Sequence, residues 1–120
     1  MRYLRMFAAV LAAIIITGCV SPADATTTDN DAIFLDVRTQ EEFNSGHIPG
    51  AVLLPLDQIE EIINLIPNLD QPISIYCRSG NRSNTALGIL IAMGYTNVTD
   101  IGGILDWTGE IVLGAANDED

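Results

Sequence analysis

The chain has 120 residues, enough for one modest domain and too few for two. Its 16 acidic residues outnumber five arginines, there is no lysine, and the formal charge is −11. This balance argues against nucleic acid as a partner, because nucleic-acid binding requires a basic surface.

The first residues have the organisation of an export signal. A basic start precedes an apolar run over residues 6–16, which is short for a membrane span of about 20 residues but suits a signal peptide. Small residues then precede Cys19, an ending that resembles a prokaryotic lipobox. We expect a signal peptide over residues 1–18, a lipidated Cys19, and an exported, membrane-anchored lipoprotein facing the periplasm or cell exterior. An uncleaved anchor and an ordinary secretory signal are the alternatives.

Cleavage before Cys19 would leave few chemically distinctive residues. The remaining basic residues would be Arg38, Arg78 and Arg82, and the remaining free thiol would be Cys77. A disulfide within the chain, a Cys-x-x-Cys redox pair and a Cys/His zinc cluster are then excluded. We expect neither a metal nor a cofactor.

The residues after Cys19 divide into a tether, a domain and a tail. Residues 19–30 are rich in Ser, Pro, Ala, Asp and Thr and predict a flexible tether, and residues 115–120 form an acidic tail. The domain, residues 31–114, opens with a nearly continuous apolar run over 32–37, typical of a buried strand. Thr39 and Glu42 match a capping box and predict the start of a short helix.

Further strands and helices alternate along the domain. Additional strands are predicted over residues 51–54, 73–76 and 95–101, the last ended by Gly102–Gly103. Helices are predicted from Asp57 to Pro67 and over 84–93, followed by a helical turn within 104–109 and an extended piece over 110–113. This alternation predicts an α/β fold with a mostly parallel sheet of about four to five strands, flanked by helices. Ligands of such sheets bind beyond the carboxyl ends of the strands, where Asp36 and Cys77 both fall.

The segment around Cys77 is the candidate site. Cys77 follows a buried strand and precedes a polar, glycine-containing turn into a helix, whose first N–H groups lack partners and carry partial positive charge. Loop N–H groups can form an anion-binding nest, and Arg78 and Arg82 add two charges. All these effects favour thiolate, so Cys77 is the predicted nucleophile. The other expected substrate-binding residues of the loop are Ser79, Gly80, Asn81 and Ser83.

Separated segments of the chain resemble one family, the single-domain rhodaneses (thiosulfate sulfurtransferases). The matching segments are Leu35–Arg38, Glu42–Phe43 with Gly46–Ala51, Tyr76–Ser83, and Gly94–Val98 with Gly102–Gly103 and Trp107. Together they cover roughly residues 31–113. The family has a short strand and helix before the first segment. Here only the polar tether is available, which leaves open whether the sheet keeps that unit.

The resemblance implies a persulfide mechanism. Cys77 would take sulfur from a small anionic donor such as thiosulfate and pass it to a thiophilic acceptor, with Arg78 and Arg82 as the cationic partners of the donor. A protein acceptor is a further candidate partner. Two other readings stay open: a sulfur carrier that holds persulfide without fast turnover, and an inactive interaction domain of the same fold. Related phosphatases and arsenate reductases use Cys-x5-Arg, whereas this loop has Cys-x4-Arg, which favours sulfur over phosphate.

Three residues outside the loop are expected to support it. Asp36 and Arg38 are predicted to form a structural ion pair beneath the loop. His47 lies in a Gly-His-Ile-Pro turn, where a hydrogen bond to the backbone is expected in preference to a general-base role.

Overall fold

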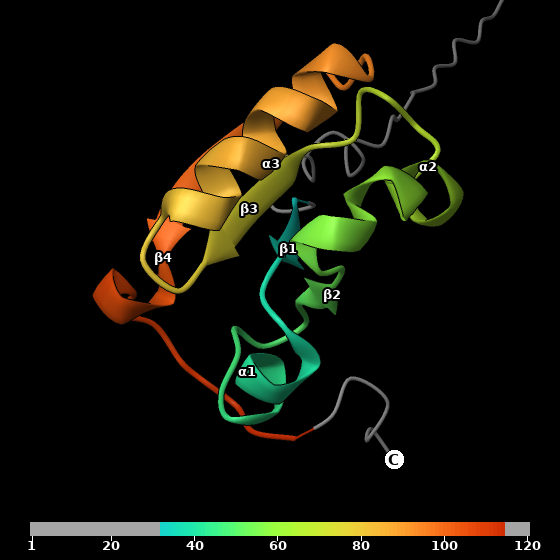
Figure 1. Ribbon diagram of the computed structural model, residues 1–120. Coiled ribbons are helices and arrows are strands. Elements are labelled where there is room, and N and C mark those ends of the chain that lie inside the picture. Colours follow the sequence, from blue (N-terminus) through green and yellow to red (C-terminus); the bar gives the residue numbers. More distant parts are fainter. Residues whose placement is uncertain (1–31, 115–120) are drawn as a thin grey trace, which may run out of the picture.

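The protein is an α/β structure built on one parallel sheet. The computed structural model describes residues 32–114. Its strands are β1 (Ile33–Asp36), β2 (Val52–Leu53), β3 (Ile73–Cys77) and β4 (Val98–Gly103), and they lie in the order β2-β1-β3-β4 (Figure 1). Every neighbouring pair is parallel, so the predicted fold class is confirmed. The predicted signal peptide, Cys19, the tether, the interval for the family's first strand and helix, and the acidic tail lie outside the described residues.

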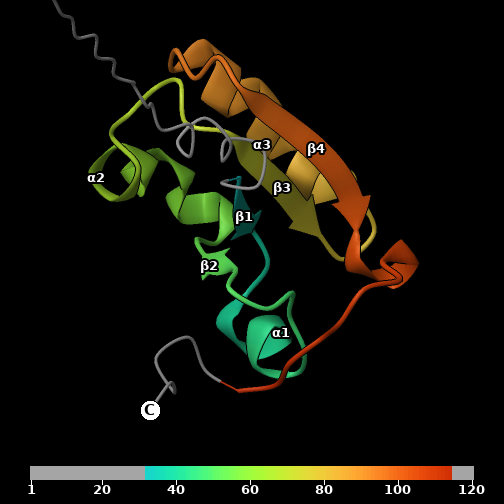
Figure 2. The same ribbon diagram turned by 180° about the vertical axis from the view of Figure 1, so that it is seen from behind.

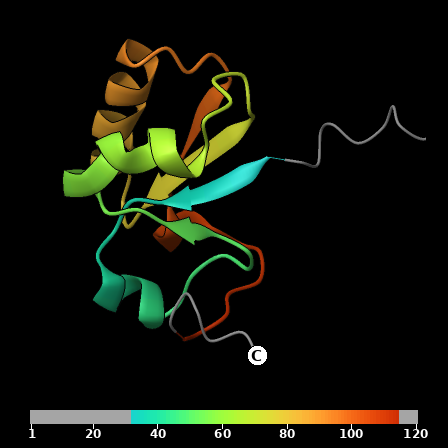
Figure 3. The same ribbon diagram turned by 90° about the vertical axis from the view of Figure 1, so that its right-hand side faces the viewer.

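The helices are divided between one face of the sheet and its carboxyl end. They are α1 (Gln40–Asn44), the 3₁₀ helix η3 (Leu56–Glu61), α2 (Ile62–Leu65), α3 (Asn81–Ala92) and the 3₁₀ helix η4 (Ile104–Asp106). Figure 3 shows η3, α2 and α3 on one side of the strands. Helices α1 and η4 lie at the same end of the sheet as the β3–α3 loop (Figure 2). None of the helices within residues 32–114 is long and apolar enough to cross a membrane.

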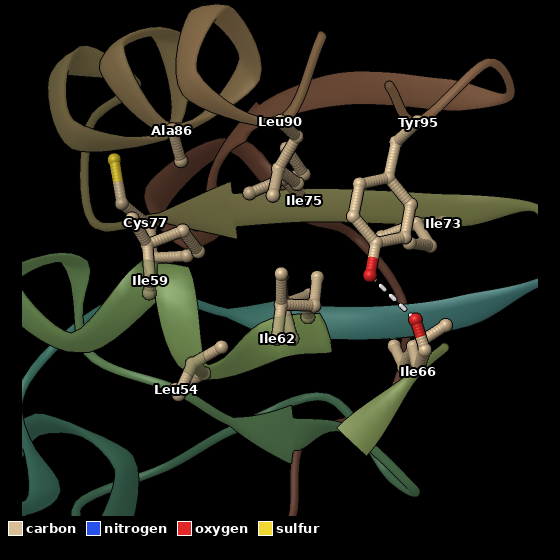
Figure 4. Close-up of a cluster of buried hydrophobic side chains, with 12 residues drawn as sticks. Leu54, Ile59, Ile62, Ile66, Ile73, Ile75, Cys77, Ala86, Leu90 and Tyr95 are labelled. Atoms are coloured by element: carbon tan, nitrogen blue, oxygen red, sulfur yellow. Dashed lines mark hydrogen bonds between the residues drawn. The ribbon is translucent and has the colours of Figure 1, made fainter. Parts of the chain in front are cut away.

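The main hydrophobic core lies between the sheet and the layer of η3, α2 and α3. Alternate residues of β3 point into it, namely Ile73, Ile75 and Cys77, as expected for a strand with a period of two residues. Leu90 of α3 and Ile62 of α2 pack over them and are fully buried (Figure 4). Each such aliphatic side chain contributes about 1.5–3 kcal/mol through burial. The core therefore anchors β3, and with it the position of Cys77.

The segment from Asp57 to Pro67 is not one α-helix as predicted. A 3₁₀ helix covers residues 56–61 and only residues 62–65 are α-helical. Ile59 of η3 and Ile62 at the start of α2 both reach the core, while Ile63 of α2 is 44% exposed. The predicted end before Pro67 is confirmed, since α2 stops at Leu65.

Two other element boundaries differ from the prediction, and both lie at the candidate site. Helix α3 begins at Asn81, three residues earlier than expected, so Arg82 and Ser83 belong to its first turn and not to the loop. Strand β4 begins later than predicted and includes Gly102 and Gly103, which pair with Tyr76 and Cys77. A register shift between Ile75 and Tyr76 makes this pairing possible, because it leaves one residue of β4 unpaired.

Candidate active site

Cys77 ends β3 with its sulfur directed toward the start of α3 (Figure 4). The residue is 1% exposed. The N–H of Gly80 donates a hydrogen bond to Cys77 Sγ at 3.0 Å. Gly80 has φ of +108°, a left-handed conformation that costs a side-chain-bearing residue about 1–2 kcal/mol, so glycine is favoured at this turn. The turn therefore directs the N–H group of Gly80 at the sulfur.

The surroundings of Cys77 favour its ionised form. Burial alone would raise the pKa of the thiol, but hydrogen bonds from the Ser83 side chain and from three backbone N–H groups outweigh it and lower the pKa from its ordinary value. Those N–H groups belong to Ser83, Gly80 and Arg82. Two of the three lie in the first turn of α3, where N–H groups have no partner within the helix. Because α3 already begins at Asn81, its first turn supplies the N–H groups of Arg82 and Ser83 that stabilise the thiolate.

The Ser83 hydroxyl can serve both protonation states of Cys77. Ser83 is fully buried, and its Oγ lies 3.6 Å from Cys77 Sγ and 3.1 Å from the carbonyl oxygen of Gly80. While the thiol is protonated, the hydroxyl can donate to Gly80 and accept from Sγ–H. Once the thiol ionises, the same hydroxyl can rotate and donate to the sulfur.

Gly102 and Gly103 of β4 pack directly against the backbone of the loop that follows Cys77. A Cβ atom on Gly103 would lie 2.2 Å from the carbonyl oxygen of Arg78 and 2.6 Å from Cα of Ser79. These are backbone atoms, which cannot move aside without displacing the loop. The absence of a side chain at Gly103 therefore allows β4 to pass directly beneath the residues that follow Cys77.

Arg82 is held by a carboxylate from α1. Its Nη1 and Nη2 atoms donate to Oε1 and Oε2 of Glu42 at 2.8 and 3.0 Å, a bidentate ion pair. Glu42 Oε1 also accepts a hydrogen bond from the N–H of Thr39, which completes the predicted capping box. The ion pair with Arg82 is the main cause that lowers the pKa of Glu42 to about 2. Arg82, predicted to face the donor, is thus already paired.

Asp36 and Arg38 form the expected ion pair, buried at the end of β1. Arg38 Nη2 lies 2.7 Å from Asp36 Oδ2 and donates a second bond of the same length to the carbonyl oxygen of Gly46. His47 is buried, and its Nδ1 lies 2.9 Å from the carbonyl oxygen of Phe43. Its backbone also pairs with Val112. The expected ion pair and the expected contact of His47 with the backbone are therefore both present.

Arg78 lies at the edge of a groove next to the loop. The groove has a volume of about 290 Å³ and is lined by Arg38, Glu42, Ser45, Gly46, Arg78, Ile104, Leu105 and Ile111. Ser79 and Asn81 are exposed, and no hydrogen bond of the Ser79 side chain is present among the described residues. Residues 32–114 also contain no cluster of His, Cys, Asp or Glu that could hold a metal ion.

Comparison with known proteins places the chain in a family. The rhodanese-like domain family matches residues 21–110. The chain belongs to this family. The rhodanese-like domain is 36% identical over 74 residues to the thiosulfate sulfurtransferase PspE of Escherichia coli, covering 61% of this chain and 71% of that protein. It is 41% identical over 78 residues to a sulfurtransferase of Allochromatium vinosum, covering 64% and 72%.

A solved structure supports the same family assignment as the two sequence relatives. The rhodanese-like domain superposes on the structure described as "rhodanese with anions from E. coli" with a TM-score of 0.66 and 34% identity, covering 69% of this chain and 99% of that one. The sequence resemblance to rhodaneses is therefore confirmed at the level of the family. The matched region begins at residue 21, within the predicted tether, and the part before residue 32 is outside the described residues.

The rhodanese-like domain brings some of the predicted site residues together and separates others. Gly80, Arg82 and Ser83 contact or face the Cys77 sulfur through hydrogen-bonding groups. The Arg82 side chain points instead to Glu42. Sequence reasoning treated Glu42 as a capping residue and Gly103 as the end of a strand, and it missed their contacts with the loop. The capping-box pattern was the available signal for Glu42, but nothing in it indicates Arg82 as a partner.

Proposed function

We propose that the protein is a sulfurtransferase that carries sulfane sulfur as a persulfide on Cys77. The observation that carries the proposal is the set of N–H groups converging on the Cys77 sulfur, which lowers the pKa of its thiol. The same groups would stabilise the terminal sulfur of a persulfide, which is also anionic. Thiosulfate is the proposed donor, in keeping with the name of the E. coli relative.

Transfer takes place in two displacements. In the first, Cys77 thiolate attacks the outer sulfur of thiosulfate, the S–S bond of the donor breaks, and sulfite leaves with the electron pair. In the second, a thiophilic acceptor attacks the outer sulfur of the persulfide, that S–S bond breaks, and its electron pair returns to Cys77 as thiolate. No external oxidant or base is needed. Ping-pong kinetics follow, because the first product leaves before the acceptor reacts.

The structure of the loop favours this chemistry over phosphoryl or arsenate chemistry. Arg82 lies five positions after Cys77 and is engaged by Glu42. A loop with Cys-x4-Arg spacing is one residue shorter than the Cys-x5-Arg loops of related phosphatases and arsenate reductases, which leaves a smaller cradle for phosphate or arsenate. The shorter loop therefore supports sulfur as the transferred group.

A sulfur carrier is the second candidate, since it would use the same persulfide. A direct assay separates the two: purified protein is incubated with thiosulfate and cyanide, and thiocyanate formation is followed together with the mass of the Cys77 peptide. Catalytic production of thiocyanate supports the transferase. A gain of one sulfur atom on Cys77 without turnover supports the carrier. Absence of both would contradict the proposal.

We also propose export and anchoring through a lipid on Cys19, on the basis of the N-terminal pattern alone. Expression of the full chain in a bacterium, followed by membrane fractionation and metabolic labelling with a fatty acid, tests it. The full chain should be labelled and sediment with membranes, and the Cys19→Ser variant should lose the label. A wild-type chain that is never labelled would refute the lipid anchor.

A further inference from the structure

The end of the domain opposite the β3–α3 loop exposes aliphatic side chains. Leu65 of α2 is 52% exposed, Leu69 in the α2–β3 loop is 38% exposed, and Ile91 in the last turn of α3 is 57% exposed. In Figure 1, α2 and the last turn of α3 lie at the end of the sheet where the strands begin. We call these three side chains the amino-end patch. A patch of exposed apolar side chains is a candidate interaction surface.

Hydrogen bonds hold together the two chain segments that carry the amino-end patch. The Tyr95 hydroxyl donates to the carbonyl oxygen of Ile66, and the N–H of Thr96 donates to the carbonyl oxygen of Leu69 at 2.9 Å. Figure 4 shows Tyr95 and Ile66 at the end of β3 opposite Cys77. The aliphatic side chains of the patch therefore come from segments that are fixed side by side, far from the nucleophile.

The surroundings of the amino-end patch are almost free of charge, although the chain is strongly acidic. Residues 62–72 and 91–97 contain one charged residue, Asp70, whose carboxylate accepts a hydrogen bond from the Thr96 hydroxyl. The opposite end also exposes aliphatic side chains, but residues 104–114 carry acidic residues among them. Carboxylates disfavour contact with a lipid surface, because they lose hydration there and are repelled by anionic headgroups. Of the two ends, only the amino end therefore suits a lipid surface.

The chain enters the domain at the same end as the amino-end patch. Ile33 is the first residue of β1, and its N–H donates to the carbonyl oxygen of Pro72, at the end of the α2–β3 loop, at 3.0 Å. Residues 20–32 connect Cys19 to Ile33 and can span at most about 45 Å. A lipid on Cys19 would therefore keep this end of the domain near the bilayer, at an effective concentration of about a millimolar or more. At such a concentration weak apolar contacts are enough to orient the domain.

We propose that the amino-end patch lies against the surface of the bilayer in which Cys19 is anchored. The proposal rests on the lipid anchor proposed above and adds the orientation of the domain. Strand β3 runs from Ile73 at this end to Cys77, and a strand rises about 3.3 Å per residue, so an upright β3 places Cys77 about 13 Å further from the lipid than Ile73. This distance exceeds the Debye length of about 8 Å at physiological salt. Anionic headgroups then do not repel an anionic sulfur donor from the site.

Hydrogen–deuterium exchange followed by mass spectrometry tests the orientation. Each protein is measured in two forms: lipidated in phosphatidylcholine vesicles, and produced from residue 19 onward without lipid but mixed with the same vesicles. The ratio of the two exchange rates removes any intrinsic effect of a substitution. In the wild type, amides of residues 62–72 and 91–97 should exchange more slowly in the lipidated form, because the bilayer covers them. Amides of residues 104–114 should exchange at the same rate in both forms.

Two double variants separate the amino-end patch from apolar exposure in general. Leu65→Ser with Ile91→Ser should abolish the slowing in the lipidated form. Leu105→Ser with Leu113→Ser is the matched control, because these leucines are 61% and 75% exposed at the opposite end, and it should keep the wild-type pattern. No slowing in the wild type, slowing over residues 104–114, or the same pattern in both variants would overturn the proposal. If intact mass shows no lipid on the wild type, the anchor itself fails and the orientation falls with it, so the two failures are distinguishable.

Discussion

Replacing Glu42 with glutamine tests whether α1 fastens the catalytic loop through Arg82. Glutamine keeps the capping box, since its side-chain oxygen can still accept from Thr39, but it removes the charge that pairs with Arg82. Glu41→Gln is the matched control. Glu41 is the preceding residue of the same helix, it is exposed, and its replacement changes the net charge by the same amount.

The size of the effect follows from the pKa of Glu42. The pKa is lowered from 4.5 to about 2, mainly by the hydrogen-bonded pair with Arg82. Such a shift corresponds to at most about 3.4 kcal/mol of folding free energy. The Glu42 and Arg82 side chains are 26% and 35% exposed, so solvent screening reduces this to about 1 kcal/mol. For a domain of this size, about 1 kcal/mol lowers Tm by about 4–8 °C.

Urea unfolding as a function of pH is the assay. Because the pKa of Glu42 is lower in the folded state, its stabilisation is complete above pH 4.5 and is lost as the pH falls toward 2. The free-energy difference between wild type and Glu42→Gln should therefore be about 1 kcal/mol at pH 7 and shrink through this window. Glu41→Gln should follow wild type throughout. A Glu42→Gln variant as stable as Glu41→Gln at pH 7 would refute the role of the ion pair.

The remaining predictions concern the loop around Cys77 and the electrostatic field that acts on thiosulfate. Gly103→Ala should place a Cβ atom against the backbone of the loop, lower the free energy of unfolding by about 1–3 kcal/mol and reduce kcat. The control is Gly88→Ala on α3, where an added Cβ meets open space, and this variant should be as stable as wild type or more stable in thermal denaturation. Ser83→Ala should raise the pKa of the Cys77 thiol, so the pH profile of its alkylation by iodoacetamide should move to higher pH. An unchanged profile would show that the Ser83 hydroxyl does not stabilise the thiolate. For thiosulfate, kcat/KM should rise with moderate salt, because screening weakens long-range repulsion by the acidic chain more than local attraction by Arg78. A steady fall from low salt would show that the arginine dominates.

The fold was predictable because, along most of the chain, the spacing of the apolar residues and the turn residues that follow them indicate the same helices and strands. Within residues 32–114 the sequence predicted a strand close to each of β1, β2, β3 and β4, and the capping box at Thr39 located α1 correctly. The errors fall where tertiary contacts override the local pattern. The isoleucines near Ile62 fit one α-helix in sequence, yet the chain is 3₁₀ over residues 56–61 and α-helical only over Ile62–Leu65, where Ile63 faces outward.

The surroundings of Cys77 were more predictable than the contacts of its neighbours. The spacing of Cys77, Gly80 and the following helix predicted N–H groups directed at the sulfur, and the N–H groups of Gly80, Arg82 and Ser83 are directed there. The partner of Arg82 could not be predicted, because Glu42 is 40 residues away in the sequence and becomes a neighbour only through the fold. The position of Gly103 opposite Cys77 likewise depends on a register shift between β3 and β4, which no local sequence pattern indicates.

The most direct test of the account is the sulfur content of Cys77 after exposure to thiosulfate. Intact-mass and peptide mass spectrometry should show a gain of one sulfur atom on Cys77, removed on addition of cyanide as thiocyanate appears in equal amount. The Cys77→Ser variant should fold, as judged by circular dichroism, but show neither the gain nor the thiocyanate. Thiocyanate formation at the wild-type rate by Cys77→Ser, or with no sulfur ever bound to Cys77, would contradict the mechanism.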